Sequence, residues 1–251
     1  MSLYHFDTTD ANYSNDPYDC SFNLQKPIIK PKSIQLKSLE MPANLPSVRN
    51  GINTMTLVTD VGSYTITLAT KNYTKLNDLL VDLNIAFTAA LPTGNQLTFS
   101  VDSFTGLVKL NVFNNVVTAI KINSYKLALS PLATYMLGYR NVPEVSTAIG
   151  VYLTASVLPN LNLDNYIYMY VNNPGLEQIN TTSNINCSFK IPFNILNGMI
   201  YYFSDTQGLK QTVNVSGDVI WTTFNVLILD RFGNKLTSFN SSDYSFSIEI
   251  N

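Results

Sequence analysis

The chain has 251 residues, of which 45% are hydrophobic and 13% are charged, and its formal net charge is −2. This length can bury the core of one large β domain or of two small domains, and the hydrophobic share excludes a disordered chain. The small charge, with no block of Lys and Arg, argues against nucleic acid as a partner. The charged share is about half of the globular average, which favours a polar surface that packs against neighbours.

Residues 1–17 show no hydrophobic periodicity and are rich in Asp, Asn, Thr and Tyr. This composition predicts an extended N-terminal arm. Two interpretations of the arm stay open: a loose terminus, or an anchor that holds a neighbouring subunit through its aromatic side chains. The candidate anchors are Tyr4, Phe6, Tyr13 and Tyr18.

Residues 18–25 alternate between apolar and polar side chains, which predicts a half-buried strand. Pro27 and Pro31 interrupt the pattern, because proline cannot donate a hydrogen bond to a neighbouring strand. A second strand is expected at 33–41, and Arg49-Asn50-Gly51 forms a turn after it.

Residues 51–139 predict a small α+β domain of order ββαβββα, inserted into the β domain. Two strand-like runs, at 54–60 and 62–70, precede a helix that begins near Thr74, with Asn72-Tyr73-Thr74 as its N-cap. The helix carries one apolar stripe, formed by Leu76, Leu79, Leu80, Leu83 and Phe87. A hairpin at 96–114, a run at 119–124 and a short helix at 130–139 complete the insert.

After a loop at 140–162, six more strands are expected, at 165–171, 185–191, 199–203, 211–215, 222–229 and 244–250. With the two strands before the insert, the count is eight, which is the number of a jelly roll. We therefore predict a mainly β fold, a discontinuous eight-stranded jelly roll over 18–50 and 140–251. Its first and last strands, 18–25 and 244–250, are expected to pair.

Tyrosines alternate with aliphatic residues in the strand at 165–171, so both of its faces are apolar or aromatic. One face then meets another layer or another subunit. The candidate interface residues on this strand are Tyr166, Tyr168 and Tyr170.

No catalytic, cofactor-binding or metal site is predicted. The only histidine is His5, and no His, Cys, Asp and Glu cluster has the spacing of metal ligands. Cys20 and Cys187 are expected to be buried free thiols, with a disulfide between them as the alternative. Four aspartates are expected to serve the backbone of turns, namely Asp205, Asp218, Asp230 and Asp243. No signal peptide and no membrane-spanning run is apparent, so folding in a cytoplasm is expected.

The order of several segments resembles the penton and minor capsid proteins of virophages, polinton-like viruses and large double-stranded DNA viruses. The segments are FNLQKPIIKPKSIQLKSLEMP, GSYTITLATKNYTKLNDLLVDLNIAF, LTFSVDSFTGLVKL, the short Leu137-Gly138-Tyr139, NLDNYIYMYV and LILDRFGNKLTSFNSSDYSFSIEI. Together they cover roughly residues 18–251. Each motif is soft, and their order is the specific part.

This resemblance implies a structural capsid subunit with a single jelly roll, which forms a homopentamer at five-fold vertices in the virion. It also implies contacts with the major capsid protein and other minor capsid proteins, after assembly in the host cytoplasm or a viral factory. The alternative is a β-sandwich module that binds a glycan or a host receptor, as in a fibre or spike. No enzyme, cofactor or membrane span is expected from either interpretation.

Overall fold

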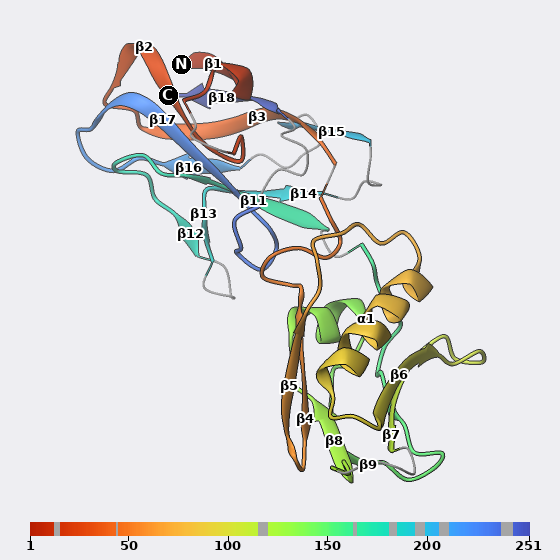
Figure 1. Cartoon of the computed structure of the whole chain (residues 1–251). Coiled ribbons are helices and arrows are strands. Elements are labelled where there is room, and N and C mark those ends of the chain that lie inside the picture. The colour runs from red at the N-terminus through yellow and green to blue at the C-terminus, as the bar shows by residue number, and fades with distance from the viewer. Residues whose placement is uncertain are drawn as a thin grey trace. The chain divides into compact units, whose positions relative to one another are not determined.

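The computed structural model describes residues 1–12, 16–43, 45–114, 120–162, 165–180, 185–193, 199–205, 211–236 and 243–251. The chain divides into two compact units (Figure 1). The first, which we call the sandwich unit, joins Met1–Leu45 to Asp164–Asn251, and the second, the insert unit, is Pro46–Leu163. Both are built mainly from antiparallel β-sheet.

The sandwich unit holds two larger sheets. One has the order β1-β18-β3-β15, with β16 also paired to β3, and the other has the order β14-β11-β17-β2. The strands are β1 (Ser2–Asp7), β2 (Asp19–Ile29), β3 (Ser33–Pro42), β11 (Tyr166–Val171), β14 (Phe189–Pro192), β15 (Ile200–Ser204), β16 (Thr212–Asn214), β17 (Ile220–Leu229) and β18 (Ser245–Ile250). The 3₁₀ turn η1 (Thr8–Asp10) follows β1, and β12 (Ile179–Asn180) pairs with β13 (Asn186–Cys187).

The strand pairs of the sandwich unit are nested. β1 pairs with β18, β2 with β17, β3 with β15 and β16, and β11 with β14, all antiparallel. β15 and β16 follow different parts of β3 and so occupy one position in the sheet. Counted in this way, the first strand pairs with the last and the second with the last but one. This is the order of a long hairpin folded over on itself into two Greek keys, the jelly-roll arrangement.

The structure corrects two expectations about the N-terminal region. Residues 2–7 are a strand of the sheet rather than part of an extended arm, and the strand at 18–25 pairs with β17, not with β18. The sequence did not predict β1 because its alternation is short: Tyr4 and Phe6 point to the core, while Leu3 and His5 face outward. Six residues with one fully buried side chain are too few to show a period in the sequence.

The core of the sandwich closes around aromatic rings from both sheets. Phe6 of β1 lies 5.0 Å from Phe22 of β2, 4.7 Å from Phe224 of β17 and 4.9 Å from Phe246 of β18, between ring centroids. All four rings are buried. Ring pairs at this separation add to the free energy of area burial, so Phe6 fixes β1 to the sandwich.

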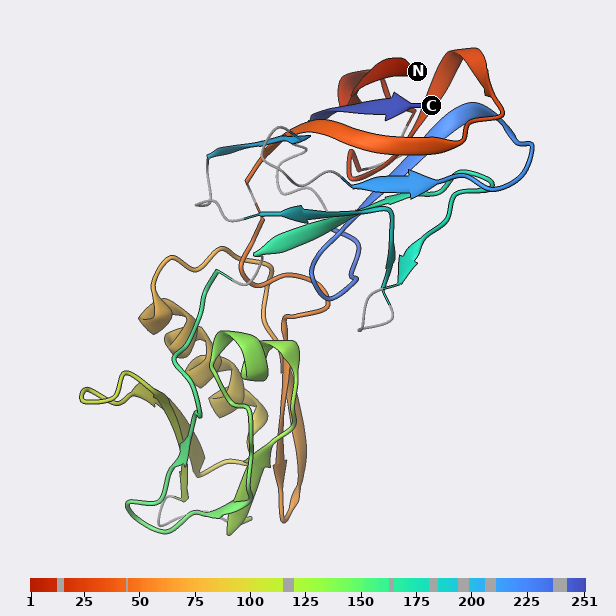
Figure 2. The same cartoon turned by 180° about the vertical axis from the view of Figure 1, so that it is seen from behind.

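The insert unit has a four-stranded sheet, β5-β4-β8-β9, and a three-stranded sheet, β10-β7-β6. Its elements are β4 (Thr54–Thr59), β5 (Gly62–Thr67), α1 (Leu76–Ala90), β6 (Asn95–Val101), β7 (Val108–Asn114), β8 (Ser124–Leu127), the π-helical turn η2 (Leu132–Met136), β9 (Val145–Ser146) and β10 (Leu153–Thr154). In both views α1 lies between the β4–β5 hairpin and the β6–β7 hairpin (Figures 1 and 2).

The insert unit is longer than the expected 51–139. Val48 forms a bridge with Lys71, and β9 and β10 pair with β8 and β7, which ties 46–50 and 140–163 to this unit. The apolar stripe of α1 is buried, at Leu79, Leu80, Leu83 and Phe87. The helix begins later than expected, after Lys75, whose backbone is extended, and no side chain caps it.

Candidate functional site

The structure places the seven predicted interface residues differently from one another. Phe6, Tyr18 and Tyr168 are only 6%, 1% and 3% exposed, so these side chains are packed inside their own subunit. Tyr4, Tyr166 and Tyr170 are half-buried. Tyr13 lies outside the described residues. A side chain in its own core offers no surface to a partner, and Phe6 and Tyr18 therefore stabilise the sandwich rather than a neighbour.

The β11 strand has two apolar faces, as its alternation indicates. Ile167, Met169 and Val171 pack into the core between the sheets. On the outer face, Tyr168 forms a separate small cluster with Ile185, Cys187 and Leu229, against which Tyr166, Tyr170 and Leu227 also pack. The outer face is thus partly covered by β13, and Tyr166 and Tyr170 remain at its border.

Tyr166 is flanked by two cations. Lys190 Nζ lies 4.1 Å from the centroid of its ring, and the guanidinium carbon of Arg231 lies 5.5 Å from it. Tyr168 meets the same ring edge-on, with the centroids 5.3 Å apart. A cation within about 6 Å of an aromatic face is attracted to it. Lys190 and Arg231 come from distant parts of the chain, so nothing local in the sequence marked them.

A second polar cluster lies on the outer face of the β1-β18-β3-β15 sheet. The pairing of β18 with β3 shifts after Ser247, which leaves Lys37 as an extra residue of β3. Lys37 Nζ lies 2.8 Å from Asp205 Oδ2 and 3.2 Å from Glu249 Oε2. Hydrogen bonds to Asp205 and then to Glu249 raise the pKa of Lys37. The Asp205 carboxylate therefore balances the charge of Lys37, whereas the sequence predicted that it would bond the backbone of a turn.

The other three aspartates also have structural partners. The carboxylate of Asp230 accepts hydrogen bonds from the backbone N–H groups of Phe232 and Asn234, as expected of a turn. Asp218 pairs with Lys30. Asp243 accepts a hydrogen bond from the Thr8 hydroxyl.

The two cysteines are free and buried. Cys20 lies in the core of the sandwich and Cys187 in the cluster outside it. Burial raises the pKa of Cys20 to about 11 and also raises the pKa of Cys187. Because the thiolate is the reactive form, these thiols are inert at neutral pH.

Within the described part of the chain, no three or more His, Cys, Asp and Glu side chains are grouped as metal ligands would be. His5 Nδ1 lies 3.0 Å from Ser247 Oγ on the exposed face of the sheet. Among the helices of the same residues, none has the length and apolar character needed to cross a membrane.

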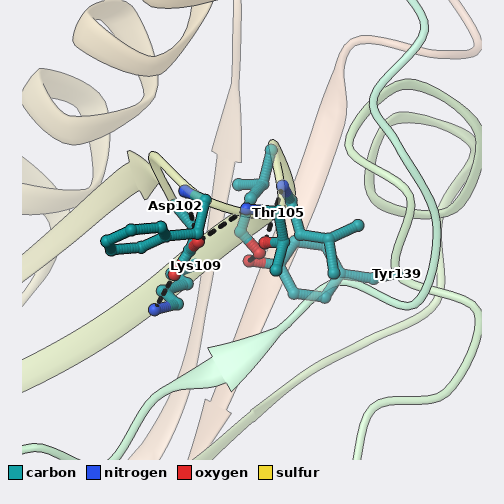
Figure 3. Close-up of polar contacts among 7 residues, drawn as sticks. Asp102, Thr105, Lys109 and Tyr139 are labelled. Carbon is teal, nitrogen blue, oxygen red and sulfur yellow. Dashed lines mark hydrogen bonds and ion pairs between the residues drawn. The ribbon is translucent and has the colours of Figure 1, made fainter.

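The turn between β6 and β7 is held by a polar cluster of the insert unit (Figure 3). Asp102 Oδ1 accepts the backbone N–H groups of Phe104 and Thr105, each at 2.9 Å, and its carboxylate forms an ion pair with Lys109. These contacts, first the one with Lys109, hold the pKa of Asp102 well below its usual range. Below the turn, the Tyr139 hydroxyl lies 3.3 Å from the carbonyl oxygen of Val108.

Two solved structures are similar to the chain over almost all of its length. The crystal structure of the mavirus penton protein has a TM-score of 0.47 and 8% sequence identity, and the comparison covers 100% of both chains. A chain of the Sputnik virophage, from a cryo-EM structure at 3.5 Å resolution, has a TM-score of 0.41 and 13% identity, covering 99% of this chain and 97% of that one. No protein-family model and no curated protein matches the sequence.

Proposed function

We propose that the protein is a structural subunit of a viral capsid, which assembles as a homopentamer at the five-fold vertices and contacts the major capsid protein. The nested pairing of the sandwich unit carries this proposal, because viral capsid proteins are among the main users of the jelly roll. Lectins and cupins also use this fold. The sequence has one histidine, which argues against a cupin metal site.

The order of the sequence segments then separates a capsid protein from a lectin. Residues 18–251 follow the segment order of penton and minor capsid proteins, and this order includes the insert unit. The proposal also places the protein in the virion.

The edges of the sandwich supply surfaces for assembly. β1 and β15 lie at opposite edges of one sheet, and the edge of a sheet can pair with a strand of another chain. β15 also carries exposed apolar side chains, Ile200 and Tyr202, beside Met199. Exposed apolar groups gathered at one edge are typical of protein interfaces.

Native mass spectrometry of the full chain tests the proposal. We expect a species of five copies, each of 27.9 kDa. Removing residues 1–17 is not a clean test of assembly, since it deletes β1 and the buried Phe6. Tyr202→Ser, on the exposed edge, is the better variant, and we expect it to weaken the pentamer without unfolding the subunit.

A species of three copies would contradict the vertex assignment and favour the alternative, a glycan- or receptor-binding module of a fibre or spike. A glycan array tests that alternative directly. Binding that depends on Tyr166 and Tyr170, the half-buried aromatic residues outside the sandwich core, would support it. A pentamer that binds no glycan would support the structural role alone.

A further inference from the structure

The two large sheets of the sandwich unit differ in the residues that protect their edges. Natural proteins discourage pairing at a sheet edge with Lys and with Pro. The β14-β11-β17-β2 sheet has both residue types at both edges, Lys26 and Pro27 in β2 and Lys190 and Pro192 in β14. The β1-β18-β3-β15 sheet has neither type in its edge strands, because β1 reads SLYHFD and β15 reads IYYFS. The sequence therefore protects the edges of one sheet and not those of the other.

The two unprotected edge strands, β1 and β15, run in opposite directions. Figure 1 shows β18 and β3 between them, and each neighbouring pair of strands in this row is antiparallel. A second copy that lies beside the first in the same orientation therefore brings its β15 antiparallel to β1 of the first. Rotation about an axis along the strands keeps the strand directions, so copies related in this way can pair edge to edge.

The backbone groups that β15 turns to its outer edge follow from its pairing with β3. The N–H of Ala43 donates to the carbonyl oxygen of Met199 at 2.7 Å, and these two residues continue the register of β3 and β15. Hydrogen-bonded pairs alternate along an antiparallel ladder. The N–H and C=O groups of Ile200 and Tyr202 therefore point away from β3, toward the edge.

The same argument applies to β1. The N–H of Thr8 donates to the carbonyl oxygen of Tyr244 at 3.0 Å, and this pair continues the register of β1 and β18. By the same alternation, the backbone groups of Leu3 and His5 point away from β18. Each edge thus directs donors and acceptors outward at alternate residues, which is the arrangement that a further antiparallel strand needs.

The side chains of the two edges match on both faces of the sheet. On the core side, Tyr4 of β1 and Tyr201 of β15 pack against the sandwich core but stay partly exposed. On the outer side, Leu3 is 68% exposed and Tyr202 is 61% exposed. The antiparallel register that sets Leu3 opposite Tyr202 also sets Tyr4 opposite Tyr201. One register therefore covers apolar side chains on both faces, and neighbours of this kind stabilise a sheet.

We propose that β1 of one copy pairs with β15 of the next copy, with Leu3 opposite Tyr202, so that the sheet continues from subunit to subunit. Each copy uses two different edges, so the contact is heterologous and closes into a ring when the rotation allows. Pairing of two β1 edges or of two β15 edges is isologous, and an odd number of copies leaves one edge unpaired. The inference rests on the proposed function, because it names the contact that joins the subunits of the proposed pentamer.

Disulfide trapping in the full chain tests the register. Opposite residues of such a pair have Cα atoms about 5.5 Å apart, a distance that a disulfide spans. We expect the double variant Leu3→Cys/Tyr202→Cys, oxidised mildly, to give a ladder of linked chains that ends at five, while the two native thiols stay buried. The matched control replaces Tyr202→Cys by Ile220→Cys, in the other sheet, because these two side chains are 61% and 60% exposed.

Each result of the trapping has a defined meaning. No ladder, or equal ladders from the double variant and the control, would overturn the edge pairing. Linked dimers that Leu3→Cys or Tyr202→Cys forms alone, in amounts equal to the double variant, would show an isologous contact and overturn it too. A ladder that ends at three would support the edge pairing and overturn the pentamer.

A comparison of Tyr202→Pro with Tyr202→Ala tests the backbone contact. Both variants lose the ring, but only proline also removes the N–H that points to the edge, while the bonds to β3 stay. We expect Tyr202→Ala to raise the concentration at which the pentamer dissociates about 10-fold. Tyr202→Pro should raise it about 10-fold further, because a carbonyl of the neighbour loses its donor. Leu3→Pro and Leu3→Ala should show the same difference at the other edge.

Native mass spectrometry over a dilution series measures the four variants, and the fluorescence of the buried Trp221 shows that each subunit is folded. If proline and alanine have equal effects at both positions while the wild type is a pentamer, the edge pairing alone is overturned. A wild-type chain that stays monomeric and forms no ladder overturns both the edge pairing and the pentamer.

Discussion

The strand pairings within the two units span different distances in sequence, up to 248 residues between Ser2 and Ile250 in the sandwich unit and 70 between Leu57 and Leu127 in the insert unit. In the sandwich unit, the N–H of Tyr244 donates to Thr8 Oγ1 across 236 residues, and β1 pairs with β18 along its whole length. In the insert unit, Asn84 of α1 bonds the backbone of Phe99, 15 residues away, and the Tyr73 hydroxyl donates to Asp82, nine residues away.

This difference has consequences for folding and for stability. Local contacts close short loops and form early, whereas contacts between the chain ends close a loop that includes the whole insert. We therefore expect the insert unit to depend on its own turns and helix, and the sandwich unit to depend on a few aromatic anchors at its ends. Each prediction below changes one kind of contact.

The largest effect is expected for Phe6→Ala. It removes the ring that contacts both sheets, and a buried Phe→Ala change costs about 3–5 kcal/mol in the free energy of unfolding. Urea denaturation followed by tryptophan fluorescence measures it, because the single tryptophan, Trp221, lies buried in the sandwich unit. The fluorescence therefore reports the unit that carries Phe6.

Phe104→Ala is the matched control for this change. This variant removes the same atoms from an exposed ring. A surface substitution that breaks no buried contact changes the free energy of unfolding of the monomer by no more than about 0.5 kcal/mol. If Phe6→Ala also costs less than about 1 kcal/mol, below the range for buried rings, β1 behaves as the loose arm that the composition predicts.

A smaller effect is expected at Gly138 in the insert unit. Gly138 has a φ of +86°, and a Cβ there would lie 2.1 Å from the carbonyl oxygen of Val157. Left-handed backbone alone costs about 1–2 kcal/mol for other residues, and the clash adds to it, so we expect roughly 2–4 kcal/mol for Gly138→Ala. Hydrogen exchange of the amides in 46–163, measured by mass spectrometry, gives the loss in the free energy of unfolding of the insert unit.

Gly150→Ala separates the two causes at Gly138. Gly150 has a φ of +82°, but a Cβ there would meet nothing within 4 Å. Gly150→Ala should therefore lose only the stability that the left-handed backbone costs, about 1–2 kcal/mol. Equal losses for the two variants would mean that the segment at Val157 moves aside.

The sequence predicted the local features better than the distant ones, for the same physical reason. The stripe of α1 is readable because Leu79, Leu83 and Phe87 recur with the period of the helix. The two faces of β11 are readable from its alternation. The pairing of β1 with β18 is not, because six residues at one end say nothing about which strand, more than 230 residues away, completes the sheet.

The candidate interface shows the same limit. Aromatic residues in a polar segment indicate either a core or a contact surface, and only the tertiary structure decides between them. Phe6 is core and Phe104 is surface, yet each stands between polar neighbours in the sequence. The difference comes from the strands that reach Phe6 from elsewhere in the chain.

The smallest change in stability is expected when the polar cluster of Asp82 in α1 is altered. Asp82 Oδ2 accepts hydrogen bonds from Lys71 Nζ at 2.8 Å and from the Tyr73 hydroxyl at 2.6 Å. These partners, Lys71 first, lower the pKa of Asp82 from its ordinary value of 3.8. A lowered carboxyl pKa stabilises the fold above the ordinary value, and this stabilisation is lost as the pH falls through the lowered one.

We expect Asp82→Asn to cost about 0.5–1 kcal/mol at pH 7, the range for a partly exposed ion pair with a hydrogen bond. Its difference from the wild type should shrink as the pH falls below 4, because protonation then removes the same charge from the wild type. Asp78→Asn, on an exposed position of the same helix, is the control for the change in net charge. Hydrogen exchange at pH 7, 5 and 3 measures all three proteins. If Asp82→Asn and Asp78→Asn give the same losses at every pH, the cluster contributes only its charge, and the local bonds that distinguish the insert unit lie elsewhere.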